Sequence, residues 1–128
     1  MKKLFIASLL LALSATFPPG LHAQVVDVSS ASQFNNAING QYVVIDFYAP
    51  WCGPCKALAP VIETVAGQYS NITFLKVNGD KFADLLKRYN IKGYPSLIFL
   101  QNGSLKRSTS GAQSLPQLTQ LIKSSFGL

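Results

Sequence analysis

Two cysteines, Cys52 and Cys55, are the residues of this 128-residue chain whose type and spacing most directly allow chemistry. Residues three apart on a helix have Cβ atoms about 5–6 Å apart, close to the separation that a disulfide accepts. We therefore expect a disulfide between Cys52 and Cys55. No zinc or iron–sulfur site is expected within the chain, because two cysteines and one histidine do not supply the ligands of such a site.

The position of the cysteines favours a redox role over a purely stabilising one. Cys52 follows an apolar run and precedes a helical pattern, so we expect it at a helix N-terminus, where free N–H groups and the helix dipole lower a thiol pKa. Cys55, one turn further, should be more buried and less acidic. The alternative is a structural disulfide, but a loop of four residues contributes only roughly 2 kcal/mol, against ~3 kcal/mol for 15 residues.

The elements around the pair are those of an α/β domain. The apolar run at residues 43–49 predicts a buried strand, and apolar positions at helical spacing predict a helix over residues 56–69, kinked at Pro60. We expect a mixed sheet with helices on both faces. The remaining predicted elements are strands at 25–28, 72–77, 96–100 and 104–110, a turn at 101–103, and helices at 32–38, 81–90 and 114–126.

The segment Trp51-Cys52-Gly53-Pro54-Cys55-Lys56 resembles the active-site motif of the thioredoxin family, and the resemblance extends over residues 25–126. It implies the thioredoxin fold and thiol–disulfide exchange without a cofactor. Further positions that match the family are Asp46 (its buried acid), Pro60 (its helix kink), Lys76 (the lysine near that acid), Gly93-Tyr94-Pro95-Ser96 (the loop with its cis-proline), Gly103 and Gly111.

The resemblance also implies roles for these residues. Cys52 would be the nucleophile, Cys55 the resolving cysteine, and Asp46 the acceptor of the Cys55 proton. Four residues would bind substrate: Gly93, Tyr94, Pro95 and Gly111. Five would support the cysteines: Trp51, Gly53, Pro54, Lys56 and Lys76.

Two of these assignments have alternatives that the sequence leaves open. Asp46 lies among apolar strand residues, where an ionised carboxylate is costly, so a raised pKa would suit a base. It could instead be a structural residue paired to Lys76. Trp51 and Tyr94 could be ordinary core or rim aromatics, but we favour an exposed apolar patch that docks partner proteins.

The first 23 residues resemble a secretory signal peptide. Lys2 and Lys3 precede the uncharged stretch 4–17, which is followed by Pro18-Pro19-Gly20 and by Ala23, after which we expect cleavage. Residues 24–128 would form the mature domain, periplasmic or secreted. An uncleaved membrane anchor is the alternative, but 14 helical residues span only about 21 Å of a ~30 Å hydrocarbon core.

Three functions remain open from the sequence. The first is an exported protein-disulfide reductase, since Gly-Pro between the cysteines resembles the family's reducing members; it would act on disulfide-containing proteins as a monomer and need a separate electron donor. The second is a dithiol oxidase or isomerase that assists folding. The third is a redox-independent binding module. Nucleic-acid binding is disfavoured, because the nine basic and five acidic residues of the mature chain are scattered.

Overall fold

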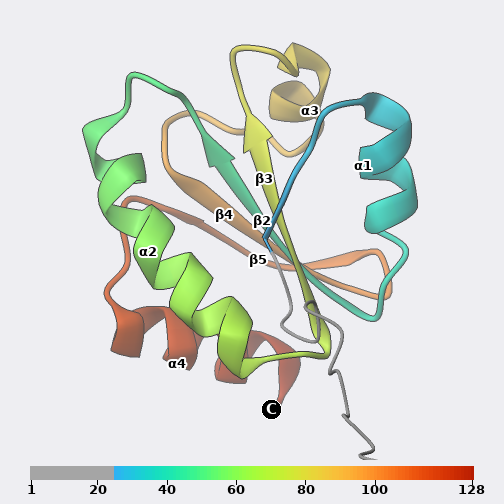
Figure 1. Cartoon of the computed structure of the whole chain (residues 1–128). Coiled ribbons are helices and arrows are strands. Elements are labelled where there is room, and N and C mark those ends of the chain that lie inside the picture. Colours follow the sequence, from blue (N-terminus) through green and yellow to red (C-terminus); the bar gives the residue numbers. More distant parts are fainter. Residues whose placement is uncertain (1–24) are drawn as a thin grey trace, which may run out of the picture.

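The computed structural model describes residues 25–128, which form a five-stranded sheet with helices packed on both faces (Figure 1). The predicted signal sequence and its cleavage site lie outside the described residues. The elements in chain order are β1 (Val25–Asp27), α1 (Ala31–Ala37), β2 (Tyr42–Tyr48), α2 (Gly53–Gln68), β3 (Ile72–Asn78), α3 (Ala83–Arg88), β4 (Ser96–Gln101), β5 (Ser104–Ser110) and α4 (Leu115–Phe126).

The sheet is mixed, as predicted, with the strand order β1-β3-β2-β4-β5. The pairs β1–β3 and β2–β3 are parallel, and the pairs β2–β4 and β4–β5 are antiparallel. The β2 strand is therefore central, and five of its seven residues are buried. A parallel pair needs a crossover connection, and α2 provides it between β2 and β3.

Two apolar layers hold the helices to the sheet. On one face, Leu58 and Ile62 of α2 and Leu118 of α4 pack against strand residues such as Val44 and Phe99. On the other face, Phe34 of α1 and Leu85 of α3 pack against their own set of strand residues. Because alternate strand residues point to opposite faces, consecutive apolar residues in β2 fill both layers.

The predicted elements are all present, with bounds that differ by at most three residues. Helix α2 begins at Gly53 rather than residue 56, because Cys52 caps it and Pro54 suits its first turn. Helix α3 covers only 83–88 of the predicted 81–90, and Phe82 gives it no side-chain cap. The predicted turn is confirmed, with Asn102 and Gly103 at φ 50° and 79°, which suits a two-residue hairpin loop.

Within residues 25–128, no helix is long and apolar enough to cross a membrane.

Candidate active site

The two cysteines form a disulfide at the N-terminus of α2, as expected, with Cα atoms 5.3 Å apart. Cys52 is the N-cap residue, and the backbone N–H of Cys55 donates to Cys52 Sγ at 3.2 Å. A sulfur that accepts this bond would be stabilised further as a thiolate. The expectation that Cys55 is the more buried of the two was wrong: both are 5% exposed, because Ala49, Tyr48 and Tyr94 pack around the pair.

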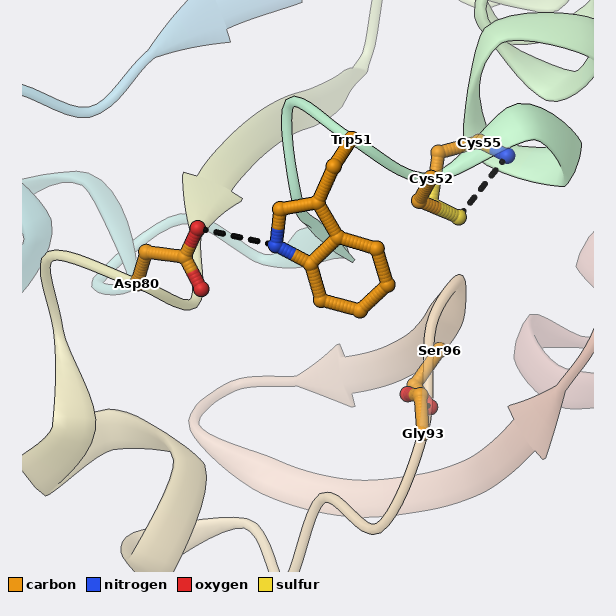
Figure 2. The surroundings of a disulfide bond; sticks show 6 residues. All are labelled: Trp51, Cys52, Cys55, Asp80, Gly93 and Ser96. Atoms are coloured by element: carbon orange, nitrogen blue, oxygen red, sulfur yellow. Dashed lines mark hydrogen bonds between the residues drawn. A yellow bond between two sulfur atoms is a disulfide. The ribbon is translucent and has the colours of Figure 1, made fainter.

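An aromatic surface lies on one side of the disulfide. Trp51 is 70% exposed, and its ring meets the Tyr94 ring edge-to-face with centroids 5.8 Å apart. The indole Nε1–H donates to Asp80 Oδ2 at 3.1 Å, and Figure 2 shows the indole lying between Asp80 and the cysteine pair. Trp51 and Tyr94 also line a pocket of about 290 Å³ together with Ile91, Lys92 and Gly93. Trp51 and Tyr94 therefore form a continuous aromatic surface that is not part of the hydrophobic core.

Tyr94 belongs to the loop that precedes β4, and the Tyr94–Pro95 peptide bond is cis, as the resemblance implied. The Ser96 hydroxyl donates to the Gly93 carbonyl at 2.7 Å, and the Gly111 N–H donates to the Pro95 carbonyl at 2.8 Å. Gly111 has φ 90°, a conformation that glycine adopts without strain. Of the predicted substrate-binding residues, Gly93 and Gly111 are exposed, whereas Pro95 is buried.

Asp46 lies at the centre of the sheet and is 2% exposed. Burial raises its pKa from 3.8 to about 7, although the nearby Lys76 charge acts in the opposite direction. Among the described residues, Asp46 Oδ1 has no hydrogen-bond partner. The predicted neighbours Asp46 and Lys76 are register partners in β2 and β3, but the Lys76 ammonium lies 4.4 Å from the centroid of the Tyr48 ring.

A second pocket, of about 220 Å³, reaches the cysteine pair from another side. Its wall includes Cys55, Lys56, Lys76 and Tyr48, and it shares no residue with the pocket beside Trp51. Gly53 and Pro54 are exposed in the first turn of α2. The site therefore has an aromatic side near Cys52 and a lysine-lined side near Cys55.

The thioredoxin family profile matches residues 25–124 of the chain. The chain belongs to the thioredoxin family. Together with the Cys52–Cys55 disulfide, membership of this family supports thiol–disulfide oxidoreductase activity.

Individual thioredoxins and a larger enzyme resemble the chain. The chloroplastic thioredoxin M-type of Spinacia oleracea is 39% identical over 102 residues, which cover 78% of this chain and 56% of that protein. A Caenorhabditis elegans peptide-N(4)-(N-acetyl-beta-glucosaminyl)asparagine amidase is 43% identical over 82 residues, 61% of this chain but 14% of the amidase. The chain thus spans only part of either relative. The solved structure of a mutant thioredoxin from Halobacterium salinarum matches with a TM-score of 0.77 and 30% identity, over 84% of this chain and 95% of that one.

The site also includes three residues that were not predicted from the sequence: Gly79, Asp80 and Tyr48. Asp80 binds the Trp51 indole, and Gly79 lies so close to the Tyr94 ring that a Cβ atom would overlap it. A usable signal was present: both residues follow the strand predicted at 72–77, and two strands joined through a helix, as this one is to the strand at 43–49, are parallel. The carboxyl ends of parallel strands meet at one edge of a sheet, so these residues had to lie near Trp51.

Residues 25–128 contain no group of three or more His, Cys, Asp or Glu side chains that could hold a metal ion.

Proposed function

We propose that this chain is a protein-disulfide reductase that works by dithiol–disulfide exchange. The observation that carries the proposal is the Cys52–Cys55 pair at the start of α2, with Cys52 as N-cap beside an exposed aromatic surface. A helix N-terminus lowers a thiol pKa, and an exposed apolar surface lets a protein substrate approach the same sulfur.

The first step uses the reduced protein. The Cys52 thiolate attacks one sulfur of the partner's disulfide, and that S–S bond breaks as a new one forms between Cys52 and the partner. The partner's other sulfur leaves as a thiolate and takes up a proton. The Cys55 N–H that donates to Cys52 Sγ supports Cys52 as the attacking sulfur.

The second step releases the partner. Cys55 gives its proton to Asp46, directly or through a water, and the Cys55 thiolate attacks Cys52 Sγ. The mixed disulfide breaks, the partner leaves as a dithiol, and the Cys52–Cys55 disulfide returns. A pKa of about 7 at Asp46 supports this assignment, because a base works best when its pKa lies near the operating pH.

Substrate docking is assigned to the aromatic surface and the adjoining loop. Trp51 and Tyr94 offer apolar area next to Cys52, and Gly93 leaves the loop exposed beside them. Partners with an accessible disulfide in an extended, apolar segment would fit there. Since each cycle leaves the chain oxidised, a separate dithiol donor must reduce it again.

We place the reaction in an exported compartment. The support is the sequence of residues 1–23, with its basic start, apolar middle and small residue at Ala23. The donor would then supply electrons outside the cytoplasm, either as a membrane protein or as a soluble one.

Cysteine variants test the assigned roles. Cys52→Ser should abolish insulin disulfide reduction, because the nucleophile is gone, and Cys55→Ser should accumulate a mixed disulfide with the substrate, visible on a non-reducing gel. Ala57→Ser, at an exposed position of α2, is the matched control and should keep the rate of the parent protein. Retained activity in Cys52→Ser would indicate the redox-independent binding module instead.

The equilibrium potential of the Cys52–Cys55 pair separates a reductase from an oxidase or isomerase. We expect a value near the thioredoxin range of about −270 mV in a dithiothreitol or glutathione series. A value near about −120 mV would reverse the direction of electron flow.

A further inference from the structure

A row of polar side chains crosses three strands beside the cysteine pair. Lys76 in β3 is the register partner of Asp27 in β1 and of Asp46 in β2. Side chains of residues that lie opposite each other project from the same face of a sheet. Lys76 therefore has a carboxyl group on each side, of which Asp27 is exposed and Asp46 is buried.

The Lys76 ammonium associates with Tyr48 rather than with Asp46. Its Nζ lies 4.4 Å from the centroid of the Tyr48 ring, a distance at which an ammonium is attracted to the ring face. Asp46 Oδ1, by contrast, accepts no hydrogen bond from any described residue. Opposite charges attract, so the Lys76 ammonium would be expected to lie against the Asp46 carboxyl. Its position over the Tyr48 ring therefore indicates a further interaction that holds it there.

Asp27 is the residue that holds the Tyr48 side chain in this position. The Tyr48 hydroxyl donates to Asp27, with distances of 3.3 Å to Oδ1 and 3.4 Å to Oδ2. Donation to a carboxylate also makes the ring more electron-rich, which strengthens its attraction for a cation. The Asp27 carboxylate adds a second negative group on the same side of Lys76.

The groups that could compete for Asp46 are few. The neighbouring strand β4 offers only the apolar Leu97 in register with it. From α2, Cys55 and Lys56 share the pocket that Tyr48 and Lys76 line. Burial is the larger cause of the raised Asp46 pKa, and Lys76 is the cation whose charge opposes it, so a change in the position of Lys76 should change how readily Asp46 ionises.

We propose that Tyr48, anchored by Asp27, is a positioning residue that holds the Lys76 ammonium away from Asp46. Asp46 then stays protonated up to near-neutral pH and can exchange a proton with Cys55. This inference rests on the proposed function, in which Asp46 accepts that proton. Tyr48 touches no reacting atom in this scheme and acts only through Lys76.

The test measures the protonation of Asp46 itself, in the oxidised full-length protein and without turnover. Carbon-13 NMR of labelled aspartate carboxyls gives the titration midpoint of Asp46. In Tyr48→Leu the freed ammonium should approach Asp46, and an opposite charge at that range lowers the midpoint by about 1 pH unit. Tyr48→Phe and Asp27→Ala keep a ring but remove its hydrogen-bonded anchor, so each should give a smaller shift in the same direction. Tyr42→Phe, at the other end of β2, should give none.

Removal of the ring also admits water to Asp46, which by itself would lower the midpoint. Tyr48→Leu is therefore repeated in a Lys76→Met background, where only the effect of water remains and the shift should be much smaller if Tyr48 acts through Lys76. A shift of the same size without Lys76 would overturn the proposal, as would an unchanged midpoint in Tyr48→Leu. An unchanged midpoint in both Tyr48→Phe and Asp27→Ala would overturn the anchoring role of Asp27.

Failure of this inference is distinguishable from failure of the proposed function. Insulin reduction that survives in Cys52→Ser would overturn the reductase scheme and would leave the NMR midpoints as they are.

Discussion

Burial changes the chemistry of Asp46, which is surrounded by apolar residues of the central strand. A carboxyl group at the surface would be ionised at neutral pH, whereas here the pKa is raised to about 7. The same shift that suits a base also affects folding, because the native state keeps a proton that the unfolded chain has lost. Stability therefore falls as the pH rises between about 4 and about 7, opposite to the trend for a carboxylate in an ion pair.

Asp46→Asn tests both consequences. Since Asn does not titrate, the variant's gain in unfolding free energy over the parent should grow from about pH 4 to about pH 8. Because the Asp46 pKa is raised from 3.8 to about 7, this gain in unfolding free energy should increase by at most about 4 kcal/mol over that pH range. Turnover of insulin near neutral pH should fall, because the proposed mechanism makes Asp46 the acceptor of the Cys55 proton. Urea denaturation at both pH values measures the first effect and initial rates measure the second.

The matched control is Glu63→Gln, which removes a carboxyl from an exposed position of α2. Its unfolding free energy should differ from that of the parent by a similar small amount at both pH values. A stability difference for Asp46→Asn that does not change with pH would contradict the raised pKa, and an unchanged turnover would return Asp46 to a structural role.

At the scale of the elements, local patterns predicted the fold well. Strand β2 was visible as a nearly continuous apolar run, broken only by Asp46, because it is buried on both faces, and α2 and α4 were visible because each buries one apolar stripe. The predicted ends of the helices were less accurate than the predicted existence of the helices. The first turn of α2 contains Gly53 and Pro54, which read as a loop, and only the cap at Cys52 shows that they are helical.

The candidate site was only partly predictable, because the resemblance supplies only the positions that match the family. Besides the cysteines and Asp46 it supplied positions from other strands and loops, namely Lys76, Gly93, Tyr94, Pro95 and Gly111. Tyr48 was read simply as a strand residue, and its contact with Asp27 joins positions 21 apart in the sequence. Such contacts depend on strand order, which residue patterns alone do not specify.

Gly79 tests how the loop after β3 shapes the aromatic surface. A Cβ atom at this position would overlap the Tyr94 ring, so Gly79→Ala must displace Tyr94 and remove its contact with Trp51. Loss of an interface aromatic typically costs more than ~1 kcal/mol, so kcat/KM for insulin should fall about tenfold. The rate with a small aromatic disulfide, which does not need the docking surface, should stay within about twofold of the parent.

Gly67→Ala is the control for Gly79→Ala. Gly67 lies in α2 with nothing within 4 Å of an added Cβ, so this change should stabilise the protein by about 0.5–1 kcal/mol and leave both rates unchanged. If Gly79→Ala slowed the small disulfide as much as insulin, the effect would be on the cysteines and not on docking.

At the scale of the whole molecule, the reactive pair lies at the start of α2, beyond the carboxyl end of the central strand β2. The carboxyl ends of β2 and β3 and the loop before β4 meet there, while the two apolar layers lie behind them. A protein built this way can place its disulfide beside an exposed aromatic side chain, Trp51, without exposing its core. Under the proposed function each cycle leaves the cysteine pair oxidised, so the compartment decides which donor reduces the protein again.

Export and reduction together predict a specific state in the cell. Most exported cysteine pairs are oxidised, whereas a working reductase must be held reduced by its donor. The protein recovered from the exported fraction should begin at Gln24, and alkylation should trap Cys52 and Cys55 mainly as thiols. Loss of the donor should shift the pair to the disulfide. Protein that begins at Met1 in the cytoplasm would contradict export, and a pair that is oxidised with the donor present would contradict the reductase.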